Sequence, residues 1–256
     1  MKEEQLDVET LHRLAARGDE LIFGKSEILN MPLEVLVDDL AEGLSQADRA
    51  FMLEAGTELR QRLKPKRFAH SISVARTCKR YATIYGVDLS MATRAGLIHD
   101  WDKCYHGQEV FDRCREMGVE LPEGYEHMEA LFHSLTGAKA LEQRFPGLEP
   151  QILQAVARHT SGAVDMAPLD IIVYVADMIE PTRAYASLDD LRGLVGEVDL
   201  ETLFARCFEV TVTFLVSKRR YFHPETANIW NAWVGESAFS RMARREAAEA
   251  SGERNG

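Results

Sequence analysis

Apolar residues recur every three or four positions through most of this chain, which is the spacing that places them on one face of an α-helix. The longest such run is Phe68, Ile72, Ala75, Cys78, Ala82 and Tyr85. Gly86 is well placed to end this helix, because a left-handed residue after a helix costs glycine little. Ser90 is then expected to cap a second helix that leads to His99. No stretch alternates like a half-buried strand, so the sequence predicts an all-α protein.

Proline marks the helix ends in the second half of the chain. Pro150 and Pro168 are suited to the first position of a helix, where the missing N–H is no loss. Pro181 is expected to end the helix that follows Pro168, because its ring clashes with the carbonyl one turn earlier. Between residues 104 and 126, glycine and proline interrupt the helical pattern and indicate a looser connection.

Length and patterning divide the chain into three parts. A chain of 256 residues can bury a sizeable core. We expect a main helical domain over residues 51–235, preceded by a short helical extension over 1–50 that is amphipathic but less apolar. Residues 236–256 are charged and end in Gly, Ser and Asn, which predicts a frayed C-terminal tail.

Charge and cysteine content exclude several classes of protein. The net charge of −11 argues against nucleic-acid binding, because affinity for the phosphate backbone needs clustered Lys and Arg. A nucleotide ligand stays open, since a bound cation can reverse the local field. The four cysteines show no C-x-x-C spacing and indicate reduced thiols rather than a zinc ribbon. With no signal peptide and no run of about 18 apolar residues, we expect a cytoplasmic protein without membrane contact.

Histidine and aspartate stand where apolar residues are expected. Four of the eight histidines lie in separate apolar helical segments: His70, His99, His133 and His159. Asp100 follows His99, and Asp177 lies within the apolar run IIVYVADMIE. A buried carboxylate costs several kcal/mol unless it is paired or coordinates a metal. A histidine of this kind taken alone is more often a hydrogen-bonded core residue, and Asp177 could instead cap a neighbouring helix or meet Arg183. Six together favour a metal site.

Six collinear sequence blocks resemble a known family. The order of the first histidine, the His-Asp pair and the last aspartate resembles the HD superfamily of metal-dependent phosphohydrolases. A narrower resemblance is to the YqeK-type symmetrical diadenosine tetraphosphate hydrolases. It rests on RFAHSISVA at 67–75, AGLIHDWDK at 95–103, HSLTGA at 133–138, RHTSG at 158–162, YVADMIEPTR at 174–183 and FHPETANIWN at 222–231. The resemblance implies an HD-domain helical bundle.

The same resemblance implies a divalent-metal enzyme. In that family the first histidine, the His-Asp pair and the last aspartate hold a metal, here His70, His99, Asp100 and Asp177. His133 and His159 match positions that serve a second metal or the phosphates, so one or two ions are expected, with these histidines and Asp100 also in catalysis. The family is linked to iron, forms homodimers, and cleaves diadenosine tetraphosphate to two ADP with metal-activated water. Imidazole and carboxylate ligands without thiolate suit iron, and also manganese, cobalt or zinc.

Five further side chains are candidates for binding substrate phosphates: Lys103, Arg67, Arg183, Thr160 and Ser161. Lys103 could neutralise leaving-group charge, or it could be a solvated lysine at a helix end. Arg67 and Arg183 could clamp phosphates bidentately, although Arg67 could instead lie on the surface. Thr160 and Ser161 could meet a phosphate or ribose, or form a plain helix C-cap.

Two departures from the family pattern bear on the substrate. Asp102 stands where a small residue is usual and adds negative charge beside a site for polyanions. Ser134, Leu135 and Thr136 replace the usual Gly-Pro-Val after the third histidine. We take symmetrical hydrolysis of dinucleoside polyphosphates as the first hypothesis. The alternatives are another HD phosphohydrolase or phosphodiesterase acting on nucleotides, and a non-catalytic nucleotide-binding regulatory module.

Overall fold

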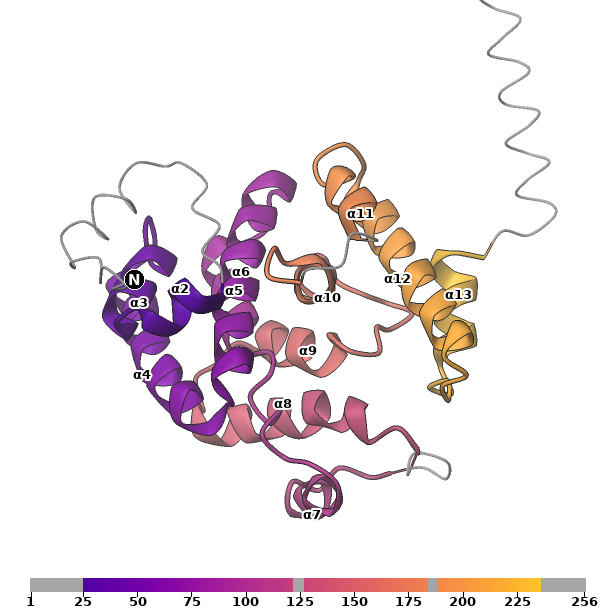
Figure 1. Ribbon diagram of the computed structural model, residues 1–256, viewed down its shortest axis with the longest axis horizontal. Helices are drawn as coiled ribbons and strands as arrows, with labels where there is room; N and C mark the ends of the chain where they lie inside the picture. Colours follow the sequence, from indigo (N-terminus) through magenta and orange to yellow (C-terminus); the bar gives the residue numbers. More distant parts are fainter. Residues whose placement is uncertain (1–24, 122–126, 184–187, 236–256) are drawn as a thin grey trace, which may run out of the picture.

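The computed structural model describes residues 25–121, 127–183 and 188–235, and these ranges contain helices and no β-strand (Figure 1). The all-α prediction is therefore confirmed for the described part of the chain. Residues 1–24 of the expected extension, and the expected tail from residue 236, lie outside the described residues. The elements are α2 (Lys25–Asn30), α3 (Leu33–Leu40), α4 (Gln46–Arg62), α5 (Pro65–Tyr85), α6 (Leu89–Ile98), α7 (Gln108–Glu116), η2 (Glu129–Leu131), α8 (Phe132–Arg144), α9 (Pro150–Arg158), α10 (Pro168–Ile179), α11 (Asp189–Gly193), α12 (Leu200–Ser217) and α13 (Thr226–Trp233).

Most of the expected helix ends agree with the structure. Helix α5 ends before Gly86, which adopts a left-handed φ of 70°, and α9 and α10 each begin at a proline. The prediction that Ser90 caps α6 is wrong. The carboxylate of Asp88 accepts the first-turn N–H at 2.7 Å, while the Ser90 hydroxyl donates to Asp48 at 2.5 Å. An ionised oxygen is a stronger acceptor than a hydroxyl, so the helix begins two residues earlier than expected.

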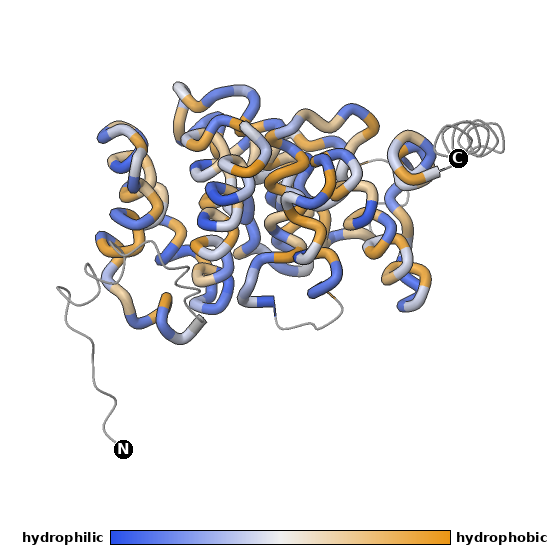
Figure 2. Tube along the Cα trace, turned by 90° about the horizontal axis from the view of Figure 1, so that it is seen from above, coloured by the Kyte–Doolittle hydropathy of each residue, from blue (hydrophilic) through white to orange (hydrophobic). Residues whose placement is uncertain are grey.

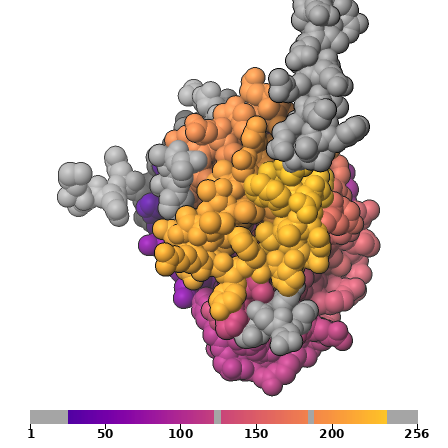
Figure 3. All heavy atoms as spheres, turned by 90° about the vertical axis from the view of Figure 1, so that its right-hand side faces the viewer, coloured from indigo at the N-terminus to yellow at the C-terminus, as the bar shows by residue number. Residues whose placement is uncertain are grey.

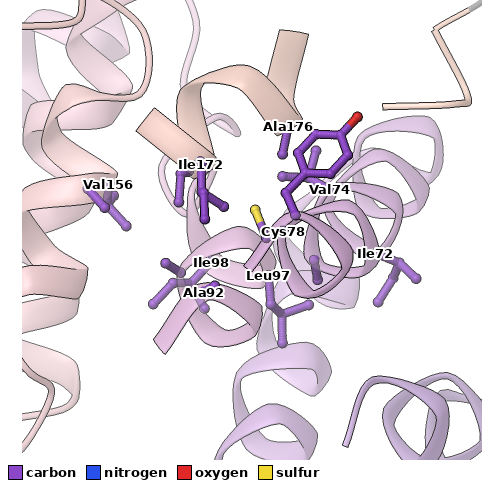
Figure 4. Packing of buried hydrophobic residues seen from close by; sticks show 14 of the residues in the cluster. Ile72, Val74, Cys78, Ala92, Leu97, Ile98, Val156, Ile172 and Ala176 are labelled. Atoms are coloured by element: carbon purple, nitrogen blue, oxygen red, sulfur yellow. The ribbon is translucent and has the colours of Figure 1, made fainter. Parts of the chain in front are cut away.

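The core lies where α5, α6, α9 and α10 pack together at the centre of the bundle (Figure 1). Apolar residues concentrate between the helices (Figure 2), and Cys78 of α5, Ile98 of α6 and Ile172 of α10 meet in this core (Figure 4). At Gly96, α6 approaches α5 so closely that a Cβ atom would lie 2.9 Å from the Cα of Ala75. A larger residue at Gly96 would push the two helices apart, so this glycine fixes where the end of α6 lies.

The helices before α4 share the core of the central helices. Ile28, Leu36 and Leu40 are buried in it. Helix α3 packs on α4 and α5, and Arg76 of α5 forms an ion pair with Asp39 of α3 at 2.6 Å. The expected boundary near residue 50 falls inside α4, so the division of the chain at that point stays a proposal.

The remaining helices cover two sides of the central bundle. Helix α12 packs on α10, and α13 packs on α12. Helix α7, the segment before α8 and the first residue of α8 form a smaller apolar cluster of Val110, Cys114, Met128 and Phe132. Within the described ranges, no helix has both the length and the apolar character needed to span a bilayer.

Candidate metal centre

Six side chains from five helical segments converge in the middle of the bundle: His70, His99, Asp100, His133, His159 and Asp177. Helices α5 and α10 supply the first and the last of them, and α8 supplies His133 near its N-terminus. His99 and His159 are the residues that directly follow α6 and α9. Successive residues within a helix point roughly 100° apart. His99, which directly follows α6, still has helical backbone angles, yet its Nε2 atom lies 3.4 Å from Oδ2 of Asp100, so the two side chains reach the same space.

Each of the four histidines has its Nδ1 atom against a protein oxygen. In His99, His133 and His159 the oxygen is the carbonyl three positions earlier, at 2.7, 2.8 and 2.7 Å respectively. In His70 it is a carboxylate oxygen of Glu180, at 3.0 Å. An Nδ1 that donates to oxygen leaves Nε2 as the nitrogen with the lone pair. The four rings are therefore oriented to present Nε2 to the cluster.

The Nε2 atoms and the two aspartates lie within a few ångströms of one another. His133 Nε2 is 3.1 Å from His159 Nε2 and 3.1 Å from Asp100 Oδ1. His70 Nε2 is 2.8 Å from Asp177 Oδ1 and 3.9 Å from Asp100 Oδ2. His99 Nε2 is buried and has no hydrogen-bond partner in the described part of the chain. A buried nitrogen lone pair without a partner needs an acceptor of electrons, and a cation satisfies that need.

The arrangement of the donors fits a divalent cation. Two nitrogen lone pairs 3.1 Å apart repel each other unless a positive charge lies between them. Two ligands bound about 2.1 Å from one ion at right angles are about 3.0 Å apart, which matches the observed spacing. The donors form three possible sets, each within 4.8 Å: His70, His99 and Asp100; His99, His159 and Asp177; Asp100, His133 and His159. Asp100 belongs to two of these sets and is therefore able to bridge two ions.

The electrostatics of Asp100, Asp177 and His133 favour the protonation states that metal binding requires, whereas hydrogen bonds to Asp177 and Glu180 outweigh burial and raise the pKa of His70, so a metal must displace a proton there. Burial raises the pKa of Asp100, but the charge of His99 and hydrogen bonds from His133 and His159 outweigh it and hold the pKa well below its usual value. Asp177 is likewise held ionised, because His70 and Arg183 outweigh the effect of its burial on the pKa. Burial lowers the pKa of His133 to about 4, so this imidazole is neutral at pH 7. Metal ligands must be deprotonated, as the two aspartates and His133 are.

Comparison with known proteins identifies the family. Residues 67–182 match the HD domain family, and this range contains all six side chains of the cluster. A protein of Bacillus subtilis named Bis(5'-nucleosyl)-tetraphosphatase, symmetrical, is 31% identical over 186 residues, which are 72% of this chain and 98% of that protein. The chain belongs to the symmetrical bis(5'-nucleosyl)-tetraphosphatase family of HD-domain proteins.

A further relative and a solved structure agree with membership of the tetraphosphatase family. A protein of the same name from Halalkalibacterium halodurans is 28% identical over 169 residues, 66% of this chain and 89% of that protein. The crystal structure of a protein from Clostridium acetobutylicum, described as a predicted HD superfamily hydrolase involved in NAD metabolism, covers 71% of this chain and 95% of its own. Its TM-score is 0.66 at 32% identity, which confirms the expected HD-type helical bundle.

Three cations expected to bind phosphate surround the cluster of this tetraphosphatase-family chain. Arg67 donates to Asp100 at 2.8 Å and Arg183 donates to Asp177 at 2.6 Å, and their side chains are 36% and 32% exposed. The suggestion that Asp177 meets Arg183 is thus correct, but Asp177 contacts His70 as well. Lys103 is partly buried beside His133, with its Nζ atom 3.1 Å from Nδ1, so it is not a freely solvated lysine.

Thr160 and Ser161 lie at the end of α9, next to the cluster. The Thr160 hydroxyl is 3.0 Å from the Ser134 hydroxyl, and Ser161 donates to the carbonyl of Gly162 at 3.1 Å. Gly162 has a left-handed φ of 71°, which turns the chain after the helix. Thr160 and Ser161 both line a cavity of about 530 Å³. Their expected contact with substrate stays a proposal.

Glu180 is a residue of the centre that sequence reasoning missed. It is fully buried, and besides His70 it accepts hydrogen bonds from the hydroxyls of Ser73 at 2.6 Å and Thr182 at 2.7 Å. Burial raises its pKa, but these hydrogen bonds outweigh the burial and lower the pKa to about 2. The available signal was its spacing, because a residue three positions after Asp177, here the one that directly follows α10, starts from the same side of the helix.

Glu180→Gln is expected to weaken metal binding and turnover by about 10–100-fold, the usual cost of losing an oriented partner behind a histidine ligand. An amide is a weaker acceptor than a carboxylate, so the His70 ring is less firmly oriented and its Nε2 is less basic. Metal titration and kcat measure the effect. Glu142→Gln, at an exposed glutamate of α8, is the control and should leave both quantities unchanged. A Glu180→Gln protein with wild-type metal affinity would contradict this role.

The extra negative charge expected at Asp102 is neutralised within the fold. The Asp102 side chain is fully buried and forms ion pairs with Arg62 of α4 at 2.8 Å and with Arg113 of α7 at 2.9 Å. The negative charge that Asp102 adds is therefore offset by two guanidinium groups. Asp102 connects α4 and α7 to the turn that carries Asp100.

Proposed function

We propose that this protein hydrolyses diadenosine tetraphosphate symmetrically to two ADP, with a divalent metal as cofactor. The observation that carries the proposal is the set of four histidines, each oriented through Nδ1 so that Nε2 faces two ionised aspartates. The names of the relatives supply the substrate class, since both are symmetrical bis(5'-nucleosyl)-tetraphosphatases.

The positions of the side chains indicate which residues would hold the metal and which would bind the phosphates. A bound divalent cation supplies Lewis acidity, which neutralises phosphoryl oxygens and lowers the pKa of water. The four histidines with Asp100 and Asp177 would hold it, and Asp100 would bridge if two ions bind. Arg67 and Arg183 are about one-third exposed next to these aspartates, so their free N–H groups can bind non-bridging phosphate oxygens. Lys103 can donate to the departing ADP, whose phosphate needs charge neutralisation more than a proton.

Iron, a homodimer and a cytoplasmic location complete the proposal. An all-imidazole and carboxylate donor set supports iron and equally manganese, cobalt or zinc, so elemental analysis of freshly purified protein decides among them. Sedimentation analysis of the purified chain tests the homodimer. The likeness to the tetraphosphatase family motivates the iron and the homodimer, and the four cysteines, interpreted as reduced thiols, motivate the cytoplasmic location.

Product analysis tests the proposed reaction directly. Metal-quantified protein incubated with diadenosine tetraphosphate should give ADP as the sole nucleotide product. ATP together with AMP, or no reaction, would overturn the assignment.

A dinuclear phosphodiesterase is the second candidate function. The set of Asp100, His133 and His159 favours it, because this set provides a second ion position next to the first. Faster turnover of cyclic nucleotides than of diadenosine tetraphosphate would support this candidate. The third hypothesis, a non-catalytic nucleotide sensor, fails if the metal-loaded protein turns over any phosphate substrate and Asp100→Ala abolishes that turnover.

A further inference from the structure

A cavity of about 530 Å³ lies between the end of α9, the C-terminal half of α12 and the segment before α8. Figure 3 views the molecule from the side on which α12 and α13 are outermost. The inner wall of the cavity adjoins the metal centre, because Thr160 and Ser161 directly follow His159 and the carbonyl of Ala130 contacts His133 at 2.8 Å. Its volume is typical of small-molecule sites. A ligand that reaches the metal centre can therefore extend into this cavity.

The outer wall combines aromatic and cationic side chains. Phe208 and Leu215 of α12 supply apolar surface, and Arg219, Arg220 and Tyr221 follow the helix. The Tyr221 ring stacks on the His127 imidazole, with ring centroids 4.3 Å apart and planes at 12°. This contact fixes the orientation of the Tyr221 ring. Tyr221 nevertheless remains 61% exposed, so aromatic surface is left uncovered. Aromatic surface beside guanidinium groups is a combination that binds nucleobases and phosphates.

The backbone of Arg219 gives a second, independent sign of function. Helix α12 ends with the N–H of Arg220 bonded to the carbonyl of Leu215 and the N–H of Arg219 bonded to that of Val216, which is the Schellman motif. In this motif the residue after the cap is left-handed, and Arg219 has a φ of 51°. Glycine fills this position most easily, and Arg219 is the only non-glycine residue with positive φ in the described ranges. An arginine at a position that glycine would fill without strain points to a task for its side chain outside the backbone.

We propose that this cavity binds one nucleoside diphosphate half of the substrate, with the nucleobase against Tyr221 and the anionic part near Arg219. The proposal rests on the proposed function, because it names where half of a dinucleotide lies when its central phosphates are at the metal centre. In a chain with a net charge of −11, the two arginines also provide local positive charge for a polyanion.

Tyr221→Ala tests the stacking part of the proposal. Loss of a base–aromatic contact is expected to raise KM for diadenosine tetraphosphate and the Kd for ADP about tenfold, with little change in kcat. Phe222→Ala is the matched control, because Phe222 is the neighbouring exposed aromatic residue and does not line the cavity. Equal KM and Kd values for the two variants would overturn the proposal.

Arg219→Gly separates binding from folding, because the two effects have opposite signs. Relief of the left-handed strain should raise the midpoint of thermal unfolding by about 2–4 °C. Loss of the guanidinium should raise KM and the Kd for ADP about tenfold. Lys218→Ala removes the adjacent charge, which lies outside the cavity lining, and should change neither constant. An Arg219→Gly protein with unchanged KM and Kd would show that Arg219 serves only the helix end.

The readouts distinguish failure of this inference from failure of the proposed function. If the wild-type protein does not cleave diadenosine tetraphosphate, the proposed function fails, and calorimetric titration with ADP alone then decides whether the cavity binds a nucleotide. If the wild-type protein cleaves it but Tyr221→Ala and Arg219→Gly bind ADP like their controls, only the cavity assignment fails.

Discussion

Asp100→Asn is expected to lower kcat for diadenosine tetraphosphate by about 10³-fold and to reduce the metal content of the purified protein. Asp100 contributes one oxygen towards His70 and His99 and the other towards His133. An amide retains the shape but loses the negative charge that both parts of the centre share. Metal-assisted hydrolysis of a phosphoanhydride depends on that cation for several kcal/mol of transition-state stabilisation.

The control for Asp100→Asn is a buried carboxylate outside the centre. Asp170 of α10 is equally buried, and it accepts hydrogen bonds from Arg158 at 2.8 Å and Gln154 at 2.9 Å. Asp170→Asn should therefore lower the free energy of unfolding while metal content and kcat stay near wild type. If Asp100→Asn keeps its metal and turns over substrate normally, the assignment of Asp100 as a ligand is wrong.

Asp102→Asn is expected to lower the free energy of unfolding by about 3 kcal/mol, because removing one partner of a buried ion pair leaves the other charges uncompensated. Arg62 and Arg113 would lose their shared carboxylate, and their side chains are only 27% and 12% exposed. Denaturant unfolding of the metal-loaded protein measures the change.

An exposed ion pair in the same region provides the comparison for Asp102→Asn. Asp112 of α7 pairs with Arg115 in solvent, and Asp112→Asn should produce no measurable change in stability. Equal unfolding free energies for Asp102→Asn and the wild type would show that the Asp102 ion pairs do not stabilise the connection between α4 and α7.

The sequence predicted the six residues of the centre because five of them lie in apolar helical segments and the sixth, Asp100, directly follows His99. Imidazole or carboxylate groups such as His70 and Asp177 are conspicuous because the other residues on the same helix face are apolar. Glu180 was missed for the opposite reason, since a glutamate at a helix end is usually solvated and only the tertiary fold buries it against His70. Patterning along the chain identifies buried polar residues only where their neighbours along the helix are apolar.

Ion-pair partners that are distant in the sequence could not be predicted from it. Asp102 looked like an unfavourable charge, because Arg62 lies 40 positions away and Arg113 lies 11 positions away. The Ser90 prediction failed at short range, where Asp88 competes for the same cap and wins through its charge. The arginine at the end of α12 carries no periodic signal, and its left-handed backbone shows only in the folded chain.

The central claim is that these histidines and aspartates hold a divalent cation on which hydrolysis depends. The most direct test measures bound metal per chain and turnover of diadenosine tetraphosphate on the same samples, before chelation, after chelation and after metal is restored. The account predicts that turnover follows metal occupancy, disappears in the metal-free protein and returns on reloading. Undiminished hydrolysis by protein that contains no detectable metal would contradict it.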